Sequence, residues 1–401
     1  MSKRILLASP HMSEEGFEQE YINKAFESNW IAPLGPNVDG FEQDIRDYTK
    51  STEALALSSG TAAIHLALKL SNIKPGDNVF CQSLTFAATA NPIMYEKANP
   101  IFIDSEYLTW NMSPEALERA FEKYPGTKVV IVVHLYGINA RMDEIRQICD
   151  DNNAILIEDA AESLGSSYKD KASGTIGDFG IFSFNGNKII TTSGGGMLVS
   201  SNKDMIDKAR FWATQAREQA RHYQHNEVGY NYRLSNVLAG IGRGQMRVLD
   251  QRVARKKEIF KKYKESLGHL DGITFMPENE WSENNYWLSS MIVKNSHITA
   301  LDVIVALENE NIESRPVWKP MHLQPVFSEY DFISVDNHDV SKDLFEHGVC
   351  LPSDTKMTDE ELERVIKIIH NVFQYTNEAA DETHYCQAFS LLYRIPKGES
   401  K

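Results

Sequence analysis

The chain has 401 residues, of which 42% are hydrophobic and 24% charged, so it is long enough to bury a large core in about two to three structural units. Its net charge of −15 argues against a nucleic acid or an acidic membrane surface as partner, but a small anionic ligand is compatible because backbone amides bind phosphate without a basic surface. Four scattered cysteines without metal-ligand spacing, and no apolar run near the roughly 20 residues of a membrane span, lead us to expect a cytoplasmic protein with free thiols and no metal.

The first half of the sequence alternates between helical and extended patterns. Residues 62–70 place their apolar side chains on one helical face. Short apolar runs over 78–86, 128–135 and 154–158 predict buried strands, and a polar-faced helix over 140–152 separates the last two. This alternation predicts right-handed crossovers and a mostly parallel sheet covered on both faces. We therefore expect residues 1–245, including an N-terminal arm, to form one large α/β domain.

The second half predicts a smaller α/β domain over residues 246–375. A helix rich in lysine and arginine over 248–265 reads as a connector, and its positive charge is expected to be a solvated face. Strand and helix patterns follow, and the last helix opens at Thr358 and Glu361 with a capping box. Residues 376–401 are expected to be a tail that is either loosely ordered or packed through the apolar run at 388–393.

Four local features have both a structural and a functional interpretation. Ser58-Ser-Gly-Thr61 is either a plain helix N-cap or a cradle for a phosphate monoester. Phe86 is either a core residue or an aromatic stacking platform at a strand end. Asp159, where a buried strand ends, either caps a helix or holds a proton on a heterocyclic nitrogen. The fourth feature, the polar and aromatic segment 229–236, reads alone as an ordinary loop.

Lys188 lies in a turn between two short apolar strands. Its neighbours Phe182, Phe184, Ile189 and Ile190 form an apolar setting that we expect to disfavour the charged amine and make it a nucleophile toward carbonyls. The alternative is an edge-strand lysine whose amine reaches solvent. Glycine clusters elsewhere fit no nucleotide-binding motif, so 194–196 is expected to be a tight strand turn and 240–244 a site of close helix packing.

The order of these features resembles the DegT/DnrJ/EryC1/StrS family of sugar-nucleotide aminotransferases. The resemblance runs from about residue 10 to 373 and is carried by these motifs: Trp30-Ile-Ala-Pro-Leu-Gly35, Ser58-Ser-Gly-Thr61, His134-Leu-Tyr-Gly137, Ile157-Glu-Asp-Ala-Ala161, Ser183-Phe-Asn-Gly-Asn-Lys188, Gly229-Tyr-Asn-Tyr-Arg233 and Lys319-Pro-Met-His322. Residues 185–197, 213–218 and 315–322 look most like the bacillosamine-pathway members, which aminate a UDP-linked 4-keto-6-deoxy-N-acetylglucosamine. The implied fold is the pyridoxal phosphate-dependent transferase fold type I.

The resemblance also implies roles for single residues. Lys188 would bind pyridoxal 5′-phosphate covalently and shuttle protons, Asp159 would pair with the ring nitrogen, and Phe86 would cover one ring face. Gly60, Thr61 and Ser183 would bind the phosphate, with Asn231 reaching it from a neighbouring subunit of a homodimer. Trp30, Arg315 and His322 would contact the sugar nucleotide. Many relatives carry glutamine where this chain has Glu162, so Glu162 is expected either to be protonated or to point elsewhere.

The implied reaction is a two-step transamination with L-glutamate as amino donor and a nucleotide-linked keto sugar as acceptor. A related class of sugar dehydratases replaces the lysine with histidine, and Lys188 argues against that class. A non-catalytic nucleotide-sugar binder would leave Lys188 and Asp159 without a role.

Overall fold

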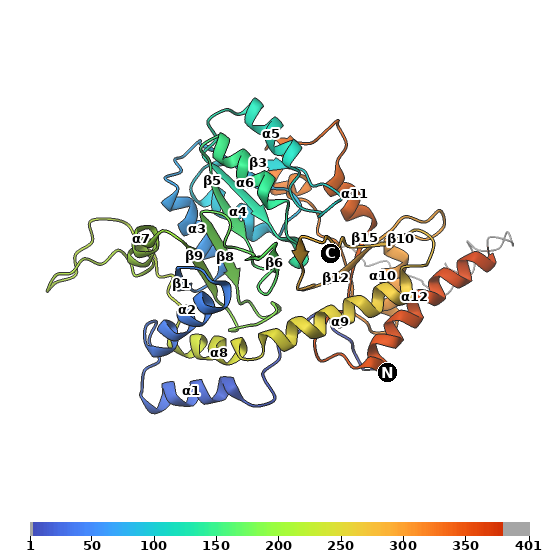
Figure 1. Ribbon diagram of the computed structural model, residues 1–401, viewed down its shortest axis with the longest axis horizontal. Helices are drawn as coiled ribbons and strands as arrows, with labels where there is room; N and C mark the ends of the chain where they lie inside the picture. The colour runs from blue at the N-terminus through green and yellow to red at the C-terminus, as the bar shows by residue number, and fades with distance from the viewer. Residues whose placement is uncertain (1–2, 380–401) are drawn as a thin grey trace, which may run out of the picture.

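A computed structural model describes residues 3–379 of the chain, and its centre is an eight-stranded sheet (Figure 1). Strand β9 runs antiparallel to both of its neighbours, and the other neighbouring strands are parallel, which confirms the expectation of a mostly parallel sheet. In spatial order the strands are β1 (Glu53–Leu57), β9 (Gly196–Ser200), β8 (Phe179–Ser183), β5 (Ile155–Asp159), β4 (Val129–Val133), β2 (Asn78–Gln82), β3 (Asn99–Ile103) and β14 (Phe332–Ile333).

Both faces of this sheet are buried, as the continuous apolar runs predicted. In β4, Val129 and Ile131 pack into one hydrophobic cluster, whereas Val130 and Val132 pack into another, because successive side chains of a strand point to opposite faces. The first cluster includes residues of α3 (Gly60–Leu70), α4 (Ala87–Tyr95) and α7 (Lys203–Ala213), and the second includes residues of α5 (Pro114–Lys123) and α6 (Met142–Asp151).

A second sheet of four antiparallel strands lies in the C-terminal part of the chain. Its strands are β10 (Ile273–Phe275), β12 (Ser289–Val293), β15 (Gly348–Leu351) and β13 (Arg315–Pro316), and its helices are α9 (Leu249–Leu267), α10 (Ala300–Asn309), α11 (Val340–His347) and α12 (Asp359–Ala379). The predicted capping box is present, with Thr358 N to Glu361 Oε2 at 3.0 Å and Glu361 N to Thr358 Oγ1 at 3.2 Å. Helix α12 continues to Ala379, four residues into the tail predicted over 376–401, and residues 380–401 of that tail lie outside the described residues.

Helix α9 connects the two parts of the chain, as predicted. Its basic side chains, however, do not all lie on a solvated face. Arg252 and Lys256 are buried, at 9% and 3% exposure, because other segments cover this side of the helix. In Figure 1, α9 continues the direction of α8 (Asn236–Met246) and lies beside α12.

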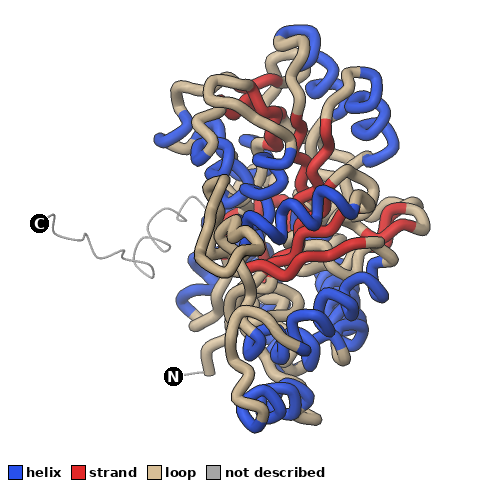
Figure 2. Tube along the Cα trace, turned by 90° about the vertical axis from the view of Figure 1, so that its left-hand side faces the viewer, coloured by secondary structure: helices blue, strands red, loops and turns tan. Residues whose placement is uncertain are grey.

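Strands from the two predicted domains pair with each other. The short strand β14 adds to the edge of the large sheet beside β3, and Ile5 of the N-terminal arm forms a bridge with Ile312. A three-stranded sheet joins β11 (Ser282–Glu283) to β6 (Ser167–Tyr168) and β7 (Lys171–Ala172). Figure 2 shows the longer strands running through the middle of the molecule beside the helices, and a strand hairpin at the right-hand edge. A division of the chain at residue 245 therefore separates two sequence regions whose strands pair with each other.

The glycines of α8 allow close helix packing, as predicted. A Cβ on Gly242 would lie 2.6 Å from the ring of Phe41 in α2 (Pro36–Thr49), and one on Gly244 would lie 2.4 Å from the backbone nitrogen of Glu18 in α1 (Phe17–Glu27). Short 3-10 helices occupy Leu135–Gly137, Met321–Leu323 and Pro325–Phe327. Within residues 3–379, none of the helices has the length and apolar character that crossing a membrane requires.

Candidate active site

A cavity of about 800 Å³ opens where the carboxyl ends of the central strands meet the C-terminal part of the chain. Ligands of open α/β sheets bind at this edge, because the strand ends deliver side chains to one place. Of the residues predicted from the sequence, the cavity is lined by Gly60, Thr61, Phe86, Asp159, Glu162, Ser183, Lys188 and Arg315.

Lys188 follows β8 in a turn closed by a hydrogen bond from its own amide to the carbonyl of Asn185. Its side chain is 12% exposed, and its amine lies 3.2 Å from Glu162 Oε1 and 4.2 Å from the ring centroid of Trp287. The expectation of an apolar setting for this amine was wrong. Phe182, Phe184 and the two isoleucines after Lys188 are buried in the core, whereas the amine itself faces a carboxylate and an indole.

Asp159 ends β5 and is 5% exposed at the floor of the cavity. Thr89 Oγ1 donates to Asp159 Oδ2 at 2.6 Å, and the amide of Ala161 donates to Oδ1 at 3.2 Å. Burial raises the pKa of this carboxyl, and the two hydrogen bonds oppose that rise. The hydroxyl of Thr85 lies 2.7 Å from that of Thr89, so a chain of two hydroxyls leads to the carboxylate. Sequence analysis missed Thr89, whose only signal is its position one helical turn after Thr85.

Glu162 points into the cavity, not away from it. Its Oε1 is the partner of Lys188, and its Oε2 accepts a 2.7 Å hydrogen bond from the amide of Tyr136. Burial raises its pKa, and the charge of Lys188 lowers it. Tyr136, which the sequence analysis did not single out, has a left-handed backbone with φ of 53° and is fully buried.

The start of α3 forms one end of the cavity. Ser59 caps this helix by accepting from the amide of Ala62, while Gly60 and Thr61 line the cavity beside Ser183. The first amides of a helix have no partner inside the helix and attract anions. Gly196 lets this turn lie against β9, because a Cβ there would lie 2.3 Å from the carbonyl carbon of Ser59.

The aromatic side chains of Phe86, Trp287 and Trp318 line the cavity. Phe86 is 59% exposed, and its ring centroid lies 5.6 Å from that of Trp318. Trp318 packs in turn against Tyr136 at 5.2 Å and Trp287 at 6.3 Å. The two tryptophans, both in the C-terminal part of the chain, were not predicted, because nothing in the sequence ties them to the strand ends.

The side chains present fit pyridoxal phosphate, the cofactor that the resemblance implies. The helix start with Ser183 suits the phosphate, and the buried carboxylate of Asp159 suits a protonated ring nitrogen. The exposed ring of Phe86 offers a stacking surface, and the amine of Lys188 opens into the same cavity.

Three predicted residues are not brought to this cavity. Trp30 is 44% exposed in the loop between α1 and α2, and Asn231 is exposed in the segment after α7. His322 is held elsewhere, with Nδ1 at 2.7 Å from Ser83 Oγ and Nε2 at 2.9 Å from Asp339 Oδ2. Arg315 lines the cavity and forms an ion pair with Glu313 at 2.8 Å.

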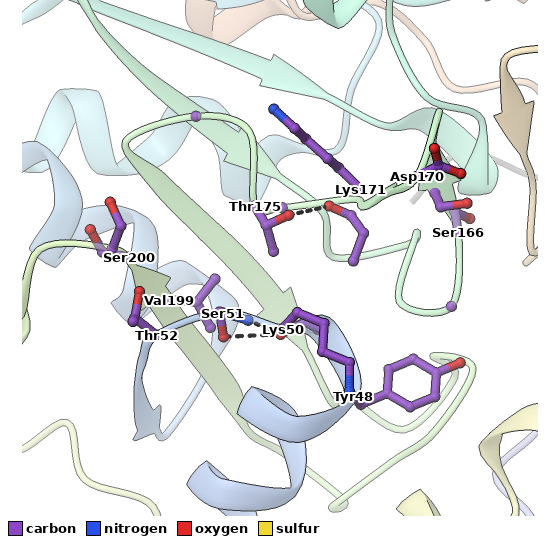
Figure 3. A pocket seen from close by; sticks show the side chains of 17 residues that line it. Tyr48, Lys50, Ser51, Thr52, Ser166, Asp170, Lys171, Thr175, Val199 and Ser200 are labelled. Carbon is purple, nitrogen blue, oxygen red and sulfur yellow. Dashed lines mark hydrogen bonds between the residues drawn. The ribbon is translucent and has the colours of Figure 1, made fainter.

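A second cavity, of about 490 Å³, lies near the opposite ends of β1, β8 and β9 (Figure 3). Its hydroxyls serve the fold: Ser200 Oγ donates to the carbonyl of Asp178, and Thr175 Oγ1 to that of Ala172. The side chains of Lys50 and Lys171 extend away from each other in Figure 3, so they do not converge on one ligand. The chemistry therefore belongs to the cavity of Lys188.

Comparison with known proteins identifies the family of this chain. Residues 12–370 match the DegT/DnrJ/EryC1/StrS aminotransferase family. The chain is 58% identical to the "Putative pyridoxal phosphate-dependent aminotransferase EpsN" of Bacillus subtilis, over 93% of this chain and 97% of the relative. It is 35% identical to the GDP-perosamine synthase of Escherichia coli O157:H7, over 89% and 96%. Its fold matches the pyridoxal phosphate form of the "Putative sugar aminotransferase Spr1654" from Streptococcus pneumoniae with a TM-score of 0.86 and 25% identity, over 93% and 100%.

Proposed function

Because this chain belongs to the DegT/DnrJ/EryC1/StrS aminotransferase family and is a pyridoxal phosphate-dependent enzyme, we propose that it moves the amino group of L-glutamate to the C4 ketone of a UDP-linked 4-keto-6-deoxy-N-acetylglucosamine. The single observation that carries the proposed site is the convergence of Lys188, Asp159 and the start of α3 on one cavity. The product is a UDP-linked 4-amino sugar for the synthesis of a surface glycan or glycoprotein.

The positions of the residues support the following roles. Gly60, Thr61 and Ser183 would hold the phosphate, and Asp159 would keep a proton on the ring nitrogen. Bound pyridoxal phosphate supplies an electron-accepting ring that stabilises negative charge on the carbon of the amino donor. The amine of Lys188 would take the proton from that carbon and hold it for return, and it would move a proton in the opposite direction with the sugar. One base thus serves both half-reactions.

Two observations bear on the acceptor sugar. Residues 185–197, 213–218 and 315–322 favour the UDP-linked N-acetylglucosamine derivative, through their resemblance to bacillosamine-pathway enzymes. The second candidate is a GDP-linked 4-keto sugar, favoured by GDP-perosamine synthases that are 33–35% identical to this chain. Arg315 on the cavity wall suits the diphosphate of either nucleotide. Sugar contacts by Trp30 and His322 stay predictions.

The proposal includes a homodimer in which Asn231 completes the phosphate site of the partner subunit. The segment after α7 supports this, because it extends away from the body of the molecule in Figure 1. Its side chains Tyr223 and Val228 are each 77% exposed, a large apolar exposure for a single surface loop. A cytoplasmic location stays part of the proposal, on the strength of the scattered cysteines.

A substrate panel tests the function. The purified enzyme receives glutamate with UDP-, GDP- and dTDP-linked 4-keto-6-deoxy sugars, and the release of 2-oxoglutarate is measured. We expect the highest kcat/KM with the UDP-linked N-acetylglucosamine derivative and no turnover by Lys188→Ala, which also loses the absorbance near ~410 nm. Equal or better turnover of the GDP sugar would reject the UDP assignment, and an active Lys188→Ala would reject the site.

A further inference from the structure

Trp287, whose indole faces the amine of Lys188, is fixed at three of its own atoms. Its amide donates to Asn285 Oδ1 at 2.9 Å, and its indole N–H donates to the carbonyl of Asn187 at 2.8 Å. Its carbonyl accepts from Lys256 Nζ at 2.7 Å. Asn187 is the residue directly before Lys188, so the indole is tied to the turn that carries the lysine. Trp287 is 2% exposed, although it lines the cavity.

The same loop also holds the other partner of Lys188. Asn285 Nδ2 donates to the carbonyl of Glu162 at 2.8 Å and to that of Leu164 at 2.9 Å. Asn285 is fully buried. One short segment of the C-terminal part therefore binds both the indole-bearing Trp287 and the backbone of Glu162, whose side chains contact the amine of Lys188.

Lys256 of α9 supports this segment from behind. Its amine, in a side chain with 3% residue exposure, donates to the carbonyl of Trp287 and to that of Ser353, each at 2.7 Å. The charged groups that act on it are Asp354, which favours the charged amine, and Arg252, which disfavours it. Lys256 thus links the connecting helix, the end of β15 and the tryptophan beside Lys188.

This arrangement is costly for the fold. Burial lowers the pKa of Lys256 to about 7, so the fold opposes the charge that an exposed lysine carries at neutral pH. An apolar side chain of similar length would avoid that cost but would leave the carbonyls of Trp287 and Ser353 without this donor. The buried lysine therefore serves to hold the backbone of Trp287 in place.

We propose that Lys256 is a positioning residue that acts through Trp287 to hold the amine of Lys188 at the cavity. An indole face attracts an ammonium group, so a fixed Trp287 keeps the released amine beside Glu162 while it exchanges protons with the substrate. Without Lys256 the carbonyl of Trp287 loses its donor, and the ring shifts relative to the lysine turn. This inference rests on the proposed role of Lys188 and adds the residue that keeps it in place.

The test measures the glutamate half-reaction, which needs no sugar, in the full-length enzyme with bound cofactor. Lys256→Met removes both hydrogen bonds and keeps the length of the side chain. Lys261→Met, at a 75% exposed position on the same helix, is the matched control. Stopped-flow absorbance is expected to show a maximal rate about tenfold lower for Lys256→Met, with the half-saturating glutamate concentration unchanged within about twofold. Lys261→Met is expected to match the wild type.

A second readout does not depend on activity. Cofactor-free protein is mixed with pyridoxal phosphate, the carbon–nitrogen bond that Lys188 forms with loss of water is reduced by borohydride, and the peptide is identified by mass. Lys256→Met is expected to slow this capture at Lys188 about tenfold. If the wild type is not captured at Lys188, the proposed site fails, independently of Lys256.

A double-mutant cycle tests whether Lys256 acts through the indole. Trp287→Phe keeps a ring but loses the hydrogen bond to Asn187, and the combined variant is expected to be no slower than the slower single variant. The inference would be overturned if the rate losses of the two single variants multiplied in the combined variant. It would also be overturned if Lys256→Met folded and showed wild-type rates of the half-reaction and of capture. If Lys256→Met does not fold, Lys256→Gln takes its place in the cycle, because glutamine keeps N–H donors without a charge. Its expected loss of rate is smaller than that of Trp287→Phe.

Discussion

Glu162 is a buried carboxylate between the amide of Tyr136 and the amine of Lys188. Its pKa is raised by burial above the ordinary value of 4.5, so the folded state holds this proton more tightly than the unfolded state. The contribution of Glu162 to the free energy of unfolding is therefore fully present below about pH 4.5 and is lost as the pH rises through the folded-state pKa.

Because the pKa of Glu162 is raised in the folded state, the effect of Glu162→Gln on stability depends on pH. We expect the melting temperature of this variant, relative to that of the wild type, to rise by about 2–4 °C between pH 4 and pH 7, because only the wild type has a carboxyl that holds its proton more tightly when folded. Scanning calorimetry at both pH values measures the difference, with Glu118→Gln at an exposed position as control. An equal shift at both pH values would show that charge is not the cause.

The shortest hydrogen bond to the carboxylate of Asp159 comes from the hydroxyl of Thr89. We expect Asp159→Asn to slow the glutamate half-reaction by about 10²-fold or more, because the amide cannot balance a proton on the ring nitrogen. Thr89→Val is expected to slow it by about tenfold or more, since a hydrogen bond to a charged group contributes roughly 1.5–3 kcal/mol. Stopped-flow absorbance gives both rates. Thr85→Val removes only the more distant hydroxyl, and a loss as large as that of Thr89→Val would contradict this order.

The residue types of the site could be predicted from the sequence, but not the surroundings of each side chain. Lys188, Asp159 and the helix start were found because motifs keep them near strand ends. The apolar neighbours of Lys188 in the sequence led to a wrong prediction of the surroundings of its amine, because adjacent residues in a turn point in different directions. The amine contacts Glu162 and Trp287. Trp287 comes from a segment about 100 residues away, and no local pattern links the two.

At the scale of secondary structure elements, the turn before α3 and strand β9 depend on each other through Gly196. A Cβ at this position would lie 2.3 Å from the carbonyl carbon of Ser59 and 2.4 Å from the amide nitrogen of Gly60. Both contacts are with backbone, which cannot turn aside as a side chain does. Gly196→Ala therefore has to displace the turn that presents Gly60 and Thr61 to the cavity.

We expect Gly196→Ala to lower the affinity for pyridoxal phosphate by about tenfold or more and to cost roughly 1–3 kcal/mol of stability. Gly194→Ala is the matched control, because a Cβ at Gly194 has no atom within 4 Å. Fluorescence titration of the cofactor-free protein with pyridoxal phosphate measures the affinity, and thermal unfolding measures the stability. Equal affinities for the two variants would show that the turn tolerates the displacement.

Helices and strands with a clear periodic pattern of apolar residues could be predicted from the sequence. Strands of two residues could not. Strands β4 and β5 and the capping box of α12 follow from apolar runs and a cap signal that act locally. Strands β13 and β14 have two residues each, which is too short for a periodic pattern, and they exist because distant strands offer them partners.

At the scale of the whole molecule, one hydrophobic cluster joins both halves of the sequence. Phe41 and Phe184 belong to it together with Phe260, Met291 and Val349. Sequence patterns place a boundary near residue 245 because the type of sheet changes there. Packing does not follow that boundary, since the core is shared and strand β14 returns to the first sheet.

The shared core predicts that residues 1–245 do not form a stable domain alone. Without residues 246–401 the fragment exposes its part of the cluster, and strand β3 loses β14 and becomes a free edge that pairs with other chains. We expect the fragment to aggregate or to unfold without a cooperative transition. Co-expression with 246–401 is expected to restore a soluble complex that binds pyridoxal phosphate, because Trp287 and Trp318 then cover the cavity. Gel filtration and thermal unfolding distinguish the cases, and a soluble, cooperatively unfolding fragment of 1–245 would show that the large sheet carries its own core.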